Sequence, residues 1–245
     1  MISEKPSIRR RGIYLLPNLF TTGALFAGFY AITSAMSGRF ETAAVAIFVA
    51  MILDGLDGRV ARLTNTQSEF GAQYDSLSDM VSFGVAPALV MYLWAFASLG
   101  KVGLFAAFVH TAGGALRLAR FNTQLTSADK RYFQGLPSPA AAAILAGFIW
   151  IGIENQYDIE IIKYLALFLT ICTGLLMVSN FRYSSFKGID FKGKVPFFMA
   201  IAVMLGIAFV MAQPAMLFYL FLVYAISGPV VTLILRKRRW QGRKQ

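Results

Sequence analysis

Residues 54–79 read DGLDGRVARLTNTQSEFGAQYDSLSD and separate two long apolar runs of the chain. The stretch contains two pairs of aspartates, Asp54 with Asp57 and Asp75 with Asp79. Residues three or four apart lie on the same face of a helix, so each pair shares one face. Because only a short turn fits between the pairs, the spacing predicts an antiparallel helical hairpin on which the two carboxylate-bearing faces meet.

The composition places this hairpin in a membrane. Of the 245 residues, 57% are hydrophobic and 14% are charged, and the mean hydropathy is +0.61. A soluble domain is about 45–50% apolar and about 25% charged. A soluble globular domain, a disordered chain and a fibrous protein are therefore excluded, and an all-α integral membrane protein is predicted. The single cysteine, Cys172, excludes an internal disulfide and a cysteine metal cage.

Eight apolar stretches are long enough to cross the hydrocarbon layer, which takes about 20 residues. We expect helices at residues 17–37, 41–63, 71–98, 102–121, 137–153, 161–179, 195–212 and 215–235. A basic juxtamembrane segment, a single transmembrane domain and a basic tail then follow one another at 1–16, 17–235 and 236–245.

The basic residues predict the orientation of these helices. Of the 23 Lys and Arg residues, the eight-helix arrangement leaves only three on one side of the membrane: Arg39, Lys101 and Lys163. Basic residues favour the cytoplasmic side, so both termini are predicted to be cytoplasmic. The net charge of +11 is then explained by contact with anionic lipid rather than with nucleic acid.

Four carboxylates that meet near a membrane interface cannot all stay ionised without cations. Hard oxygen ligands at this density suit Mg²⁺ or Mn²⁺, and two such ions can clamp a diphosphate. Two alternatives remain open at this point. One is a salt-bridged helix end in which Arg59 and Arg62 neutralise the aspartates, and the other is an ion or proton pathway.

Small residues surround the aspartates, namely Gly55, Gly58, Ala61, Gly71 and Ala72. A glycine inside a helix costs about 1 kcal/mol relative to alanine, but it allows a ligand to approach the backbone closely. Arg62, one turn beyond Gly58, can reach a phosphate oxygen.

Taken together, these residues form the pattern D-x2-D-G-x2-A-R, eight residues, then G-x3-D-x3-D. Every fixed position of this pattern is present between Asp54 and Asp79. The pattern resembles the signature of the CDP-alcohol phosphotransferases. The resemblance implies a core of six helices, with the two C-terminal helices as additions, and displacement of CMP from a CDP-linked group by an alcohol.

The resemblance also implies a role for each motif residue. Asp54, Asp57 and Asp75 would ligate two divalent metal ions, and Asp79 would touch a metal and act as the base. Binding of the CDP-linked substrate, CDP-diacylglycerol, is implied for Asp57, Gly58, Arg62 and Gly71.

Four further stretches resemble the bacterial phosphatidylserine synthases of this family: SDMVSFGVAP at 78–87, RLARFN at 117–122, GLPSPA at 135–140 and RYSSFK at 182–187. This likeness implies transfer of a phosphatidyl group from CDP-diacylglycerol to L-serine at the cytoplasmic face of the inner membrane. It also implies a homodimer. Serine carries a carboxylate that suits an arginine fork, so the candidate acceptor-binding residues are Arg117, Arg120, Asn122 and Ser82.

Several of these residues also have an ordinary structural interpretation. Arg117 and Arg120 can be cytoplasmic anchors, and Ser138 can cap the helix that follows it. His110 lies in an apolar stretch and is expected to be packed and hydrogen-bonded rather than catalytic. The lysines at 187, 192 and 194 are expected in a lipid-facing loop.

Other functions remain as alternatives. The acceptor can instead be glycerol 3-phosphate or inositol phosphate, because Arg117, Arg120, Lys130 and Arg131 supply positive charge. Intramembrane prenyltransferases use two separate DxxxD-type motifs on distant helices, which are not found here. A phospholipase D-like synthase needs H-x-K motifs, and His110 is followed by Thr111 and Ala112. The non-enzyme alternative is a divalent-cation transporter, which predicts polar groups spread through several helices.

Overall fold

The computed structural model describes residues 8–124, 132–184 and 213–241, and these residues are almost entirely helical. The helices and turns before the first strand are α1 (Ile8–Met36), α2 (Phe40–Leu63), α3 (Glu69–Asp79), η1 (Met80–Val85), α4 (Ala86–Met91), η2 (Tyr92–Phe96), η3 (Ala97–Leu99) and α5 (Lys101–Gln124). The remaining elements are β1 (Tyr132–Gln134), α6 (Ser138–Glu154), α7 (Ile159–Val178), β2 (Arg182–Ser184) and α9 (Pro214–Gln241).

Seven of the eight expected helices correspond to elements of this structure. The largest differences are at the two ends, where α1 begins at Ile8 rather than near residue 17 and α9 continues to Gln241. The helix expected at 71–98 is a continuous helical column from Glu69 to Leu99 that contains wider turns at η1 and η2. The helix expected at 195–212, with the lysines at 187, 192 and 194, lies outside the described residues.

Within the described residues, five segments are long and apolar enough to cross a membrane: Leu16–Met36, Glu69–Leu99, Lys101–Thr123, Ile159–Val178 and Ala215–Leu233. Two of the other expected spans, α2 and α6, do not meet the length and hydropathy expected of a membrane-crossing helix. The α2 helix carries Asp54, Asp57, Arg59 and Arg62 in its second half, and α6 is a shorter apolar helix of 17 residues. The all-α membrane fold is therefore confirmed, whereas the total of eight spans and the orientation of the termini stay predictions.

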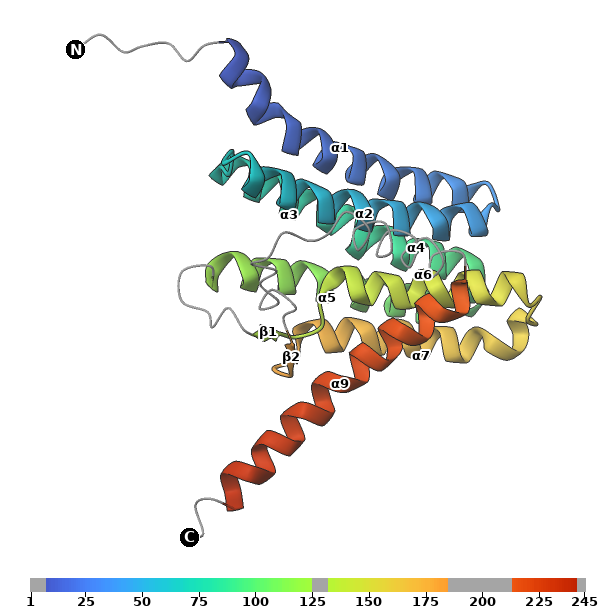
Figure 1. Cartoon of the computed structure of the whole chain (residues 1–245). Coiled ribbons are helices and arrows are strands. Elements are labelled where there is room, and N and C mark those ends of the chain that lie inside the picture. Colours follow the sequence, from blue (N-terminus) through green and yellow to red (C-terminus); the bar gives the residue numbers. More distant parts are fainter. Residues whose placement is uncertain (1–7, 125–131, 185–212, 242–245) are drawn as a thin grey trace.

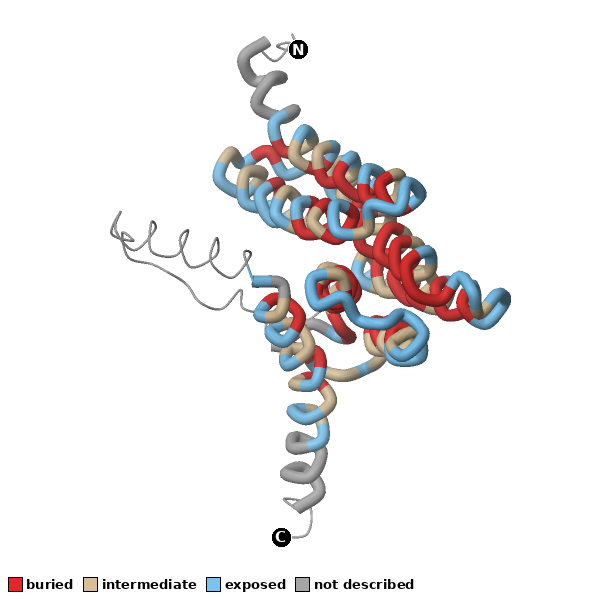
Figure 2. The backbone as a smooth tube through the Cα atoms, turned by 90° about the vertical axis from the view of Figure 1, so that its right-hand side faces the viewer, coloured by how far each residue is buried: buried red, intermediate tan, exposed pale blue. Residues whose placement is uncertain are grey.

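The helices pack as a bundle with α6 in its interior. The α1 and α2 helices form an antiparallel pair, and α6 packs against both α2 and α9 (Figure 1). Buried residues concentrate inside the bundle, and exposed ones line its outer flanks (Figure 2). In α6, the alanines from Ala140 to Ala143 are all buried. Such small side chains let neighbouring helices approach closely.

The α5 helix, which carries several candidate site residues, is fixed against α7 by two glycines. A Cβ atom added to Gly113 would lie 2.4 Å from the carbonyl oxygen of Gly174, and one added to Gly174 would lie 2.7 Å from that of Val109. No larger side chain fits at either position while the helices keep this spacing. The backbone of α5 is therefore held in one place relative to α7.

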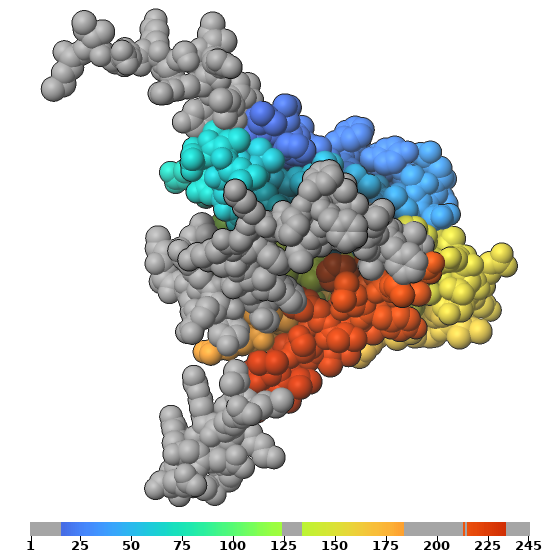
Figure 3. All heavy atoms as spheres, viewed as in Figure 1, coloured from blue at the N-terminus to red at the C-terminus, as the bar shows by residue number. Residues whose placement is uncertain are grey.

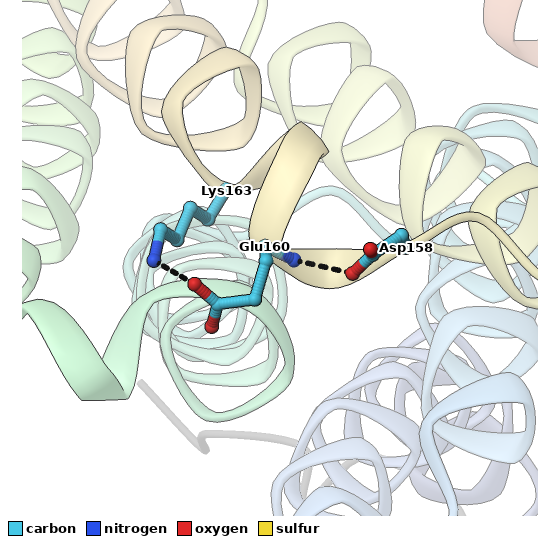
Figure 4. Close-up of polar contacts among 3 residues, drawn as sticks. All are labelled: Asp158, Glu160 and Lys163. Atoms are coloured by element: carbon cyan, nitrogen blue, oxygen red, sulfur yellow. Dashed lines mark hydrogen bonds and ion pairs between the residues drawn. The ribbon is translucent and has the colours of Figure 1, made fainter.

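The turn between α6 and α7 lies at the end of α6 remote from Ser138 and carries acidic residues. The side chain of Asp158 accepts a hydrogen bond of 2.9 Å from the backbone N–H of Glu160, which caps the start of α7 (Figure 4). Glu160 in turn forms an ion pair with Lys163 one turn later (Figure 4). Acidic residues at this helix end are favourable because they face the positive end of the helix dipole.

A short ribbon of two antiparallel strands, β1 and β2, occurs where the sequence predicts loops. Phe133 pairs with Tyr183 in this ribbon. The Tyr183 hydroxyl donates a hydrogen bond of 3.0 Å to the carbonyl oxygen of Ala225, and its ring lies so close to Gly228 that a Cβ there would be 2.3 Å away. This contact attaches α9 to the rest of the bundle, and α9 lies across one face of the molecule (Figure 3).

His110 supports the wider turn of the helical column. Pro87 has no backbone N–H, so it cannot donate to the carbonyl oxygen of Phe83, four residues earlier, as a residue of an ordinary α-helix would. The Nε2 atom of His110 lies 3.2 Å from that oxygen, and Nδ1 lies 2.9 Å from the hydroxyl of Thr173. His110 is fully buried, so the expectation of a packed, hydrogen-bonded histidine is confirmed. Because a carbonyl can only accept, Nε2 carries the proton.

We predict that His110→Leu lowers the melting temperature of the detergent-purified protein. Leucine leaves the Phe83 carbonyl without a donor, and an unmet buried polar group costs about 1–3 kcal/mol. The control is Phe108→Leu, a change at an exposed apolar position of the same helix. Equal melting of His110→Leu and the wild type would show that this carbonyl needs no donor.

Candidate active site

The predicted hairpin is formed by α2 and α3, and a tight turn fixes its geometry. The α2 helix ends at Leu63, and Asn65 adopts a left-handed conformation with φ of 51°, which asparagine tolerates better than most residues. Ser68 caps α3 by accepting a hydrogen bond of 3.0 Å from the N–H of Gly71. This turn reverses the chain between α2 and α3, and α1 packs against both helices.

This turn brings the aspartates together as the sequence predicts. Asp54, Asp57 and Asp75 each offer a carboxylate oxygen, and these three atoms all lie within 4.8 Å of one another. Asp79 completes the group because its carboxyl lies within electrostatic range of those of Asp54 and Asp75. Asp54 therefore stands at the centre of the four carboxylates.

The chemistry of this cluster fits a divalent cation. Oδ1 of Asp75 is buried and has no hydrogen-bond partner among the described residues, although buried polar atoms are nearly always paired. A cation bound between the carboxylates would supply the missing partner. The set contains only hard oxygen atoms, which Mg²⁺ and Mn²⁺ prefer.

The salt-bridge alternative is wrong. Arg59 and Arg62 are exposed, and in the described part of the chain neither forms an ion pair with an aspartate. The aspartates are therefore not neutralised by the arginines that follow them in sequence.

Thr21 of α1 is a site residue that the sequence did not reveal. Its hydroxyl lies 2.6 Å from Oδ2 of Asp57, to which it donates, and its carbonyl oxygen accepts a hydrogen bond of 3.1 Å from Ser78. One residue of α1 thus orients an aspartate of α2 and also holds the turn of α3 next to Asp79. The only signal in the sequence is a polar residue in an otherwise apolar stretch, and it does not identify the partner.

The glycines differ in their surroundings. A Cβ atom at Gly55 or Gly58 would meet no other atom within 4 Å, whereas one at Gly71 would lie 3.1 Å from Oγ of Ser68. Packing within the described protein thus explains Gly71 in part but does not explain Gly58.

The four acceptor candidates fall into two groups. Three of them form hydrogen bonds that hold helices together: Arg120 with the carbonyl oxygens of Val178 and Ser179, Asn122 with Ser76, and Ser82 with the carbonyl oxygen of Ala24. Arg117 is different because its guanidinium points inward, within electrostatic range of Asp54 and Asp79.

The expected cap at Ser138 is wrong. Pro137 occupies the capping position of α6, and no side chain caps this helix. The hydroxyl of Ser138 instead accepts a hydrogen bond of 2.7 Å from Nη1 of Arg117. This inward contact also means that the guanidinium of Arg117 is not directed toward lipid headgroups as an anchor would be.

A model of the CDP-alcohol phosphatidyltransferase family matches residues 14–233 of the chain. The chain belongs to this family. The match contains the whole hairpin and extends through most of α9, so α9 lies within the part of the chain that resembles the family. Membership of an enzyme family also sets aside the cation-transporter alternative.

Three relatives illustrate which members of the family this phosphatidyltransferase chain resembles. A Helicobacter pylori protein named CDP-diacylglycerol–serine O-phosphatidyltransferase is 39% identical over 218 residues, which cover 87% of this chain and 90% of the relative. A Methanocaldococcus jannaschii protein of the same name is 42% identical over 182 residues, covering 74% and 80%. An archaetidylserine synthase of Methanothermobacter thermautotrophicus is 34% identical over 175 residues, covering 71% of each.

We predict that Asp75→Asn weakens the binding of Mn²⁺. An ion that binds only the folded protein raises the melting temperature, so Mn²⁺ should stabilise the detergent-purified wild type and stabilise Asp75→Asn much less. The matched control is Glu69→Gln, which removes an exposed carboxylate from the first turn of the same helix. An undiminished Mn²⁺ shift in Asp75→Asn would exclude Asp75 from the metal site.

Proposed function

We propose that this chain transfers the phosphatidyl group of CDP-diacylglycerol to the hydroxyl of L-serine, giving phosphatidylserine and CMP. The observation that carries the proposal is the carboxylate cluster, with three oxygens within 4.8 Å and one buried oxygen without a partner. The printed activity of the Helicobacter pylori and Methanocaldococcus jannaschii relatives supports serine as the acceptor.

Asp54, Asp57 and Asp75, with Asp79 at the edge, would hold two divalent ions, Mg²⁺ or Mn²⁺. Such ions, when bound, neutralise the oxygens of a diphosphate and the charge that develops on the departing CMP. Thr21 keeps Asp57 in a fixed orientation through its hydrogen bond of 2.6 Å. A ligand oriented before the substrate arrives needs no rearrangement during the reaction.

Asp79 is the proposed base. The serine oxygen forms a bond to the phosphorus of the phosphatidyl group, the bond from that phosphorus to the CMP oxygen breaks, and the hydroxyl proton passes to the carboxylate of Asp79. A carboxylate is a weak base for a hydroxyl group. The transfer nevertheless suffices, because the loose transition state of phosphoryl transfer needs little base strength.

The donor is proposed to lie along the α2–α3 edge, against Asp57, Gly58, Arg62 and Gly71. The open space at Gly58 supports this placement, because a substrate that occupies it would explain why the position has no side chain. Arg62 is exposed at the same end of α2, where its guanidinium can bind phosphate oxygens.

For the acceptor, Arg117 is the leading candidate to bind the serine carboxylate, because its guanidinium lies within electrostatic range of Asp54 and Asp79. Arg120, Asn122 and Ser82 are proposed to support this pocket through the helices that they hold. We further propose eight spans with cytoplasmic termini, an active site facing the cytoplasm at the inner membrane, and a homodimer. The proposed transmembrane domain spans 17–235, between basic segments at 1–16 and 236–245.

The first test is acceptor-dependent release of CMP by the detergent-purified protein, given CDP-diacylglycerol and Mg²⁺ or Mn²⁺. We expect release with L-serine, and none with glycerol 3-phosphate or inositol phosphate. EDTA and Asp79→Asn should each abolish release. The control Asp158→Asn should retain it, since asparagine caps a helix as well as aspartate does and this residue lies at the start of α7.

Release with another acceptor would keep the metal site and the donor but overturn serine. No release with any acceptor from a folded, metal-loaded sample would overturn the proposed transfer.

We predict that Gly58→Ala raises the KM for CDP-diacylglycerol by at least roughly tenfold, equivalent to about 1.4 kcal/mol, because the added methyl group occupies space assigned to the donor. The protein should lose no stability, since alanine is favoured over glycine in a helix by about 1 kcal/mol. Gly55→Ala is the matched control, because it adds a methyl group at an equally open position of the same helix outside the motif. Equal KM values for the two variants would contradict this donor placement.

A further inference from the structure

The hydrogen bond between Arg117 and Ser138 joins the candidate acceptor site to α6, a helix that carries none of the four aspartates. Nη1 of Arg117 on α5 donates to Oγ of Ser138, the first residue of α6, over 2.7 Å. Ser138 is fully buried. A buried hydroxyl that accepts from a guanidinium makes a charge-assisted hydrogen bond, which is stronger than one between neutral groups.

The position of Ser138 is fixed by the backbone that precedes it. Gly135 donates its N–H to the carbonyl oxygen of Phe181 over 2.9 Å, and Leu136 donates to that of Leu176 over 3.0 Å. Gly135 has a φ of 80°, and a Cβ there would lie 2.2 Å from the carbonyl oxygen of Met177. Only glycine allows this approach. The start of α6 is therefore docked onto the carboxyl end of α7, and Ser138 cannot follow the arginine if the arginine moves.

Other elements enclose the same guanidinium. Asp54 and Asp79 lie within electrostatic range of Arg117 on one side, and Tyr224 of α9 does so as well. The ring of Tyr224 packs on that of Tyr183, with 5.5 Å between the ring centres. The α9 helix is in turn held by the hydrogen bond from Tyr183 to Ala225. Arg117 is thus surrounded by α2, α3, α6 and α9 and is not a free surface cation.

We infer that Ser138 is a positioning residue for substrate binding and acts through Arg117. Without the hydrogen bond to Ser138, an arginine beside a cluster of carboxylates would turn all the N–H groups of its planar guanidinium fork toward them. The hydroxyl of Ser138 holds one edge of the fork, and in the proposed arrangement the remaining N–H groups bind the acceptor beside Asp79. An acceptor carboxylate bound there by two parallel hydrogen bonds would have its own hydroxyl near the base. The inference rests on the proposed function and extends it to a residue outside the aspartate hairpin.

The test compares Ser138→Ala with Ser138→Thr and with Ser34→Ala. Ser34 is a matched control, because it is also fully buried but its hydroxyl has no partner in the part of the chain that the structure describes. Ser138→Ala should raise the KM for L-serine roughly tenfold or more, the effect of losing a hydrogen bond to a charged group. The KM for CDP-diacylglycerol should stay near its wild-type value, whereas the melting temperature should fall, because the guanidinium of Arg117 loses a buried acceptor. Ser138→Thr, which keeps the hydroxyl, should restore the KM for serine, and Ser34→Ala should leave it unchanged.

A double-mutant cycle separates positioning from packing. If Ser138 acts only through Arg117, adding Ser138→Ala to Arg117→Ala should cause no further rise in KM. An equal effect of Ser138→Ala in both backgrounds, or a rise in both KM values together, would overturn the inference. If the wild type uses another acceptor, serine is wrong, and the same cycle is scored on the KM of that acceptor. A wild type that transfers to no acceptor overturns the proposed function and this inference with it.

Discussion

The main constraint on this structure is electrostatic. Four carboxylates lie close together in an otherwise apolar helical bundle, which is unfavourable in free energy. Isolated charges of one sign are strongly unfavourable in such surroundings, yet Asp54, Asp57 and Asp75 approach one another within 4.8 Å. Within the described residues, Thr21 donates one hydrogen bond to Asp57, and Arg117 lies within electrostatic range of Asp54 and Asp79. The divalent ions of the proposed function would supply further positive charge, and the neighbouring helices hold the carboxylates in place.

Three separate braces keep this arrangement rigid. The α1 helix binds both sides of the hairpin through Thr21, whose hydroxyl contacts Asp57 and whose carbonyl contacts Ser78. The α5 helix is locked onto α7 by Gly113 and Gly174. The start of α6 is docked onto the end of α7 by the backbone of the residues before Ser138. Each brace ends next to a residue of the proposed reaction. Contacts far from the cluster therefore fix the positions of the site residues.

The sequence was sufficient for features that repeat along one helix and insufficient for contacts between helices. Hydropathy located seven helices of the described residues. The spacing of Asp54, Asp57, Asp75 and Asp79 predicted the hairpin, because the helical repeat alone sets which residues share a face. Three features depend on elements distant in sequence: the bond from Thr21 to Asp57, the acceptance of the Arg117 hydrogen bond by Ser138, and the strand pairing of Phe133 with Tyr183. No local pattern encodes these partners. The possibility that Ser138 caps α6 is wrong for this reason, because the partner of its hydroxyl, Arg117, lies on another helix.

The pairing of Pro87 with His110 has a consequence for how this chain can change over evolutionary time. The proline removes a donor from one helix, and the histidine of another helix supplies one. The residues allowed at positions 87 and 110 therefore depend on each other. Replacing the proline with an ordinary residue would restore the helical N–H and release position 110 to vary. Losing the histidine first leaves an unmet carbonyl, whereas losing the proline first does not. A lineage that loses both residues should therefore lose the proline before the histidine. Related chains should carry the histidine mainly where they carry the proline.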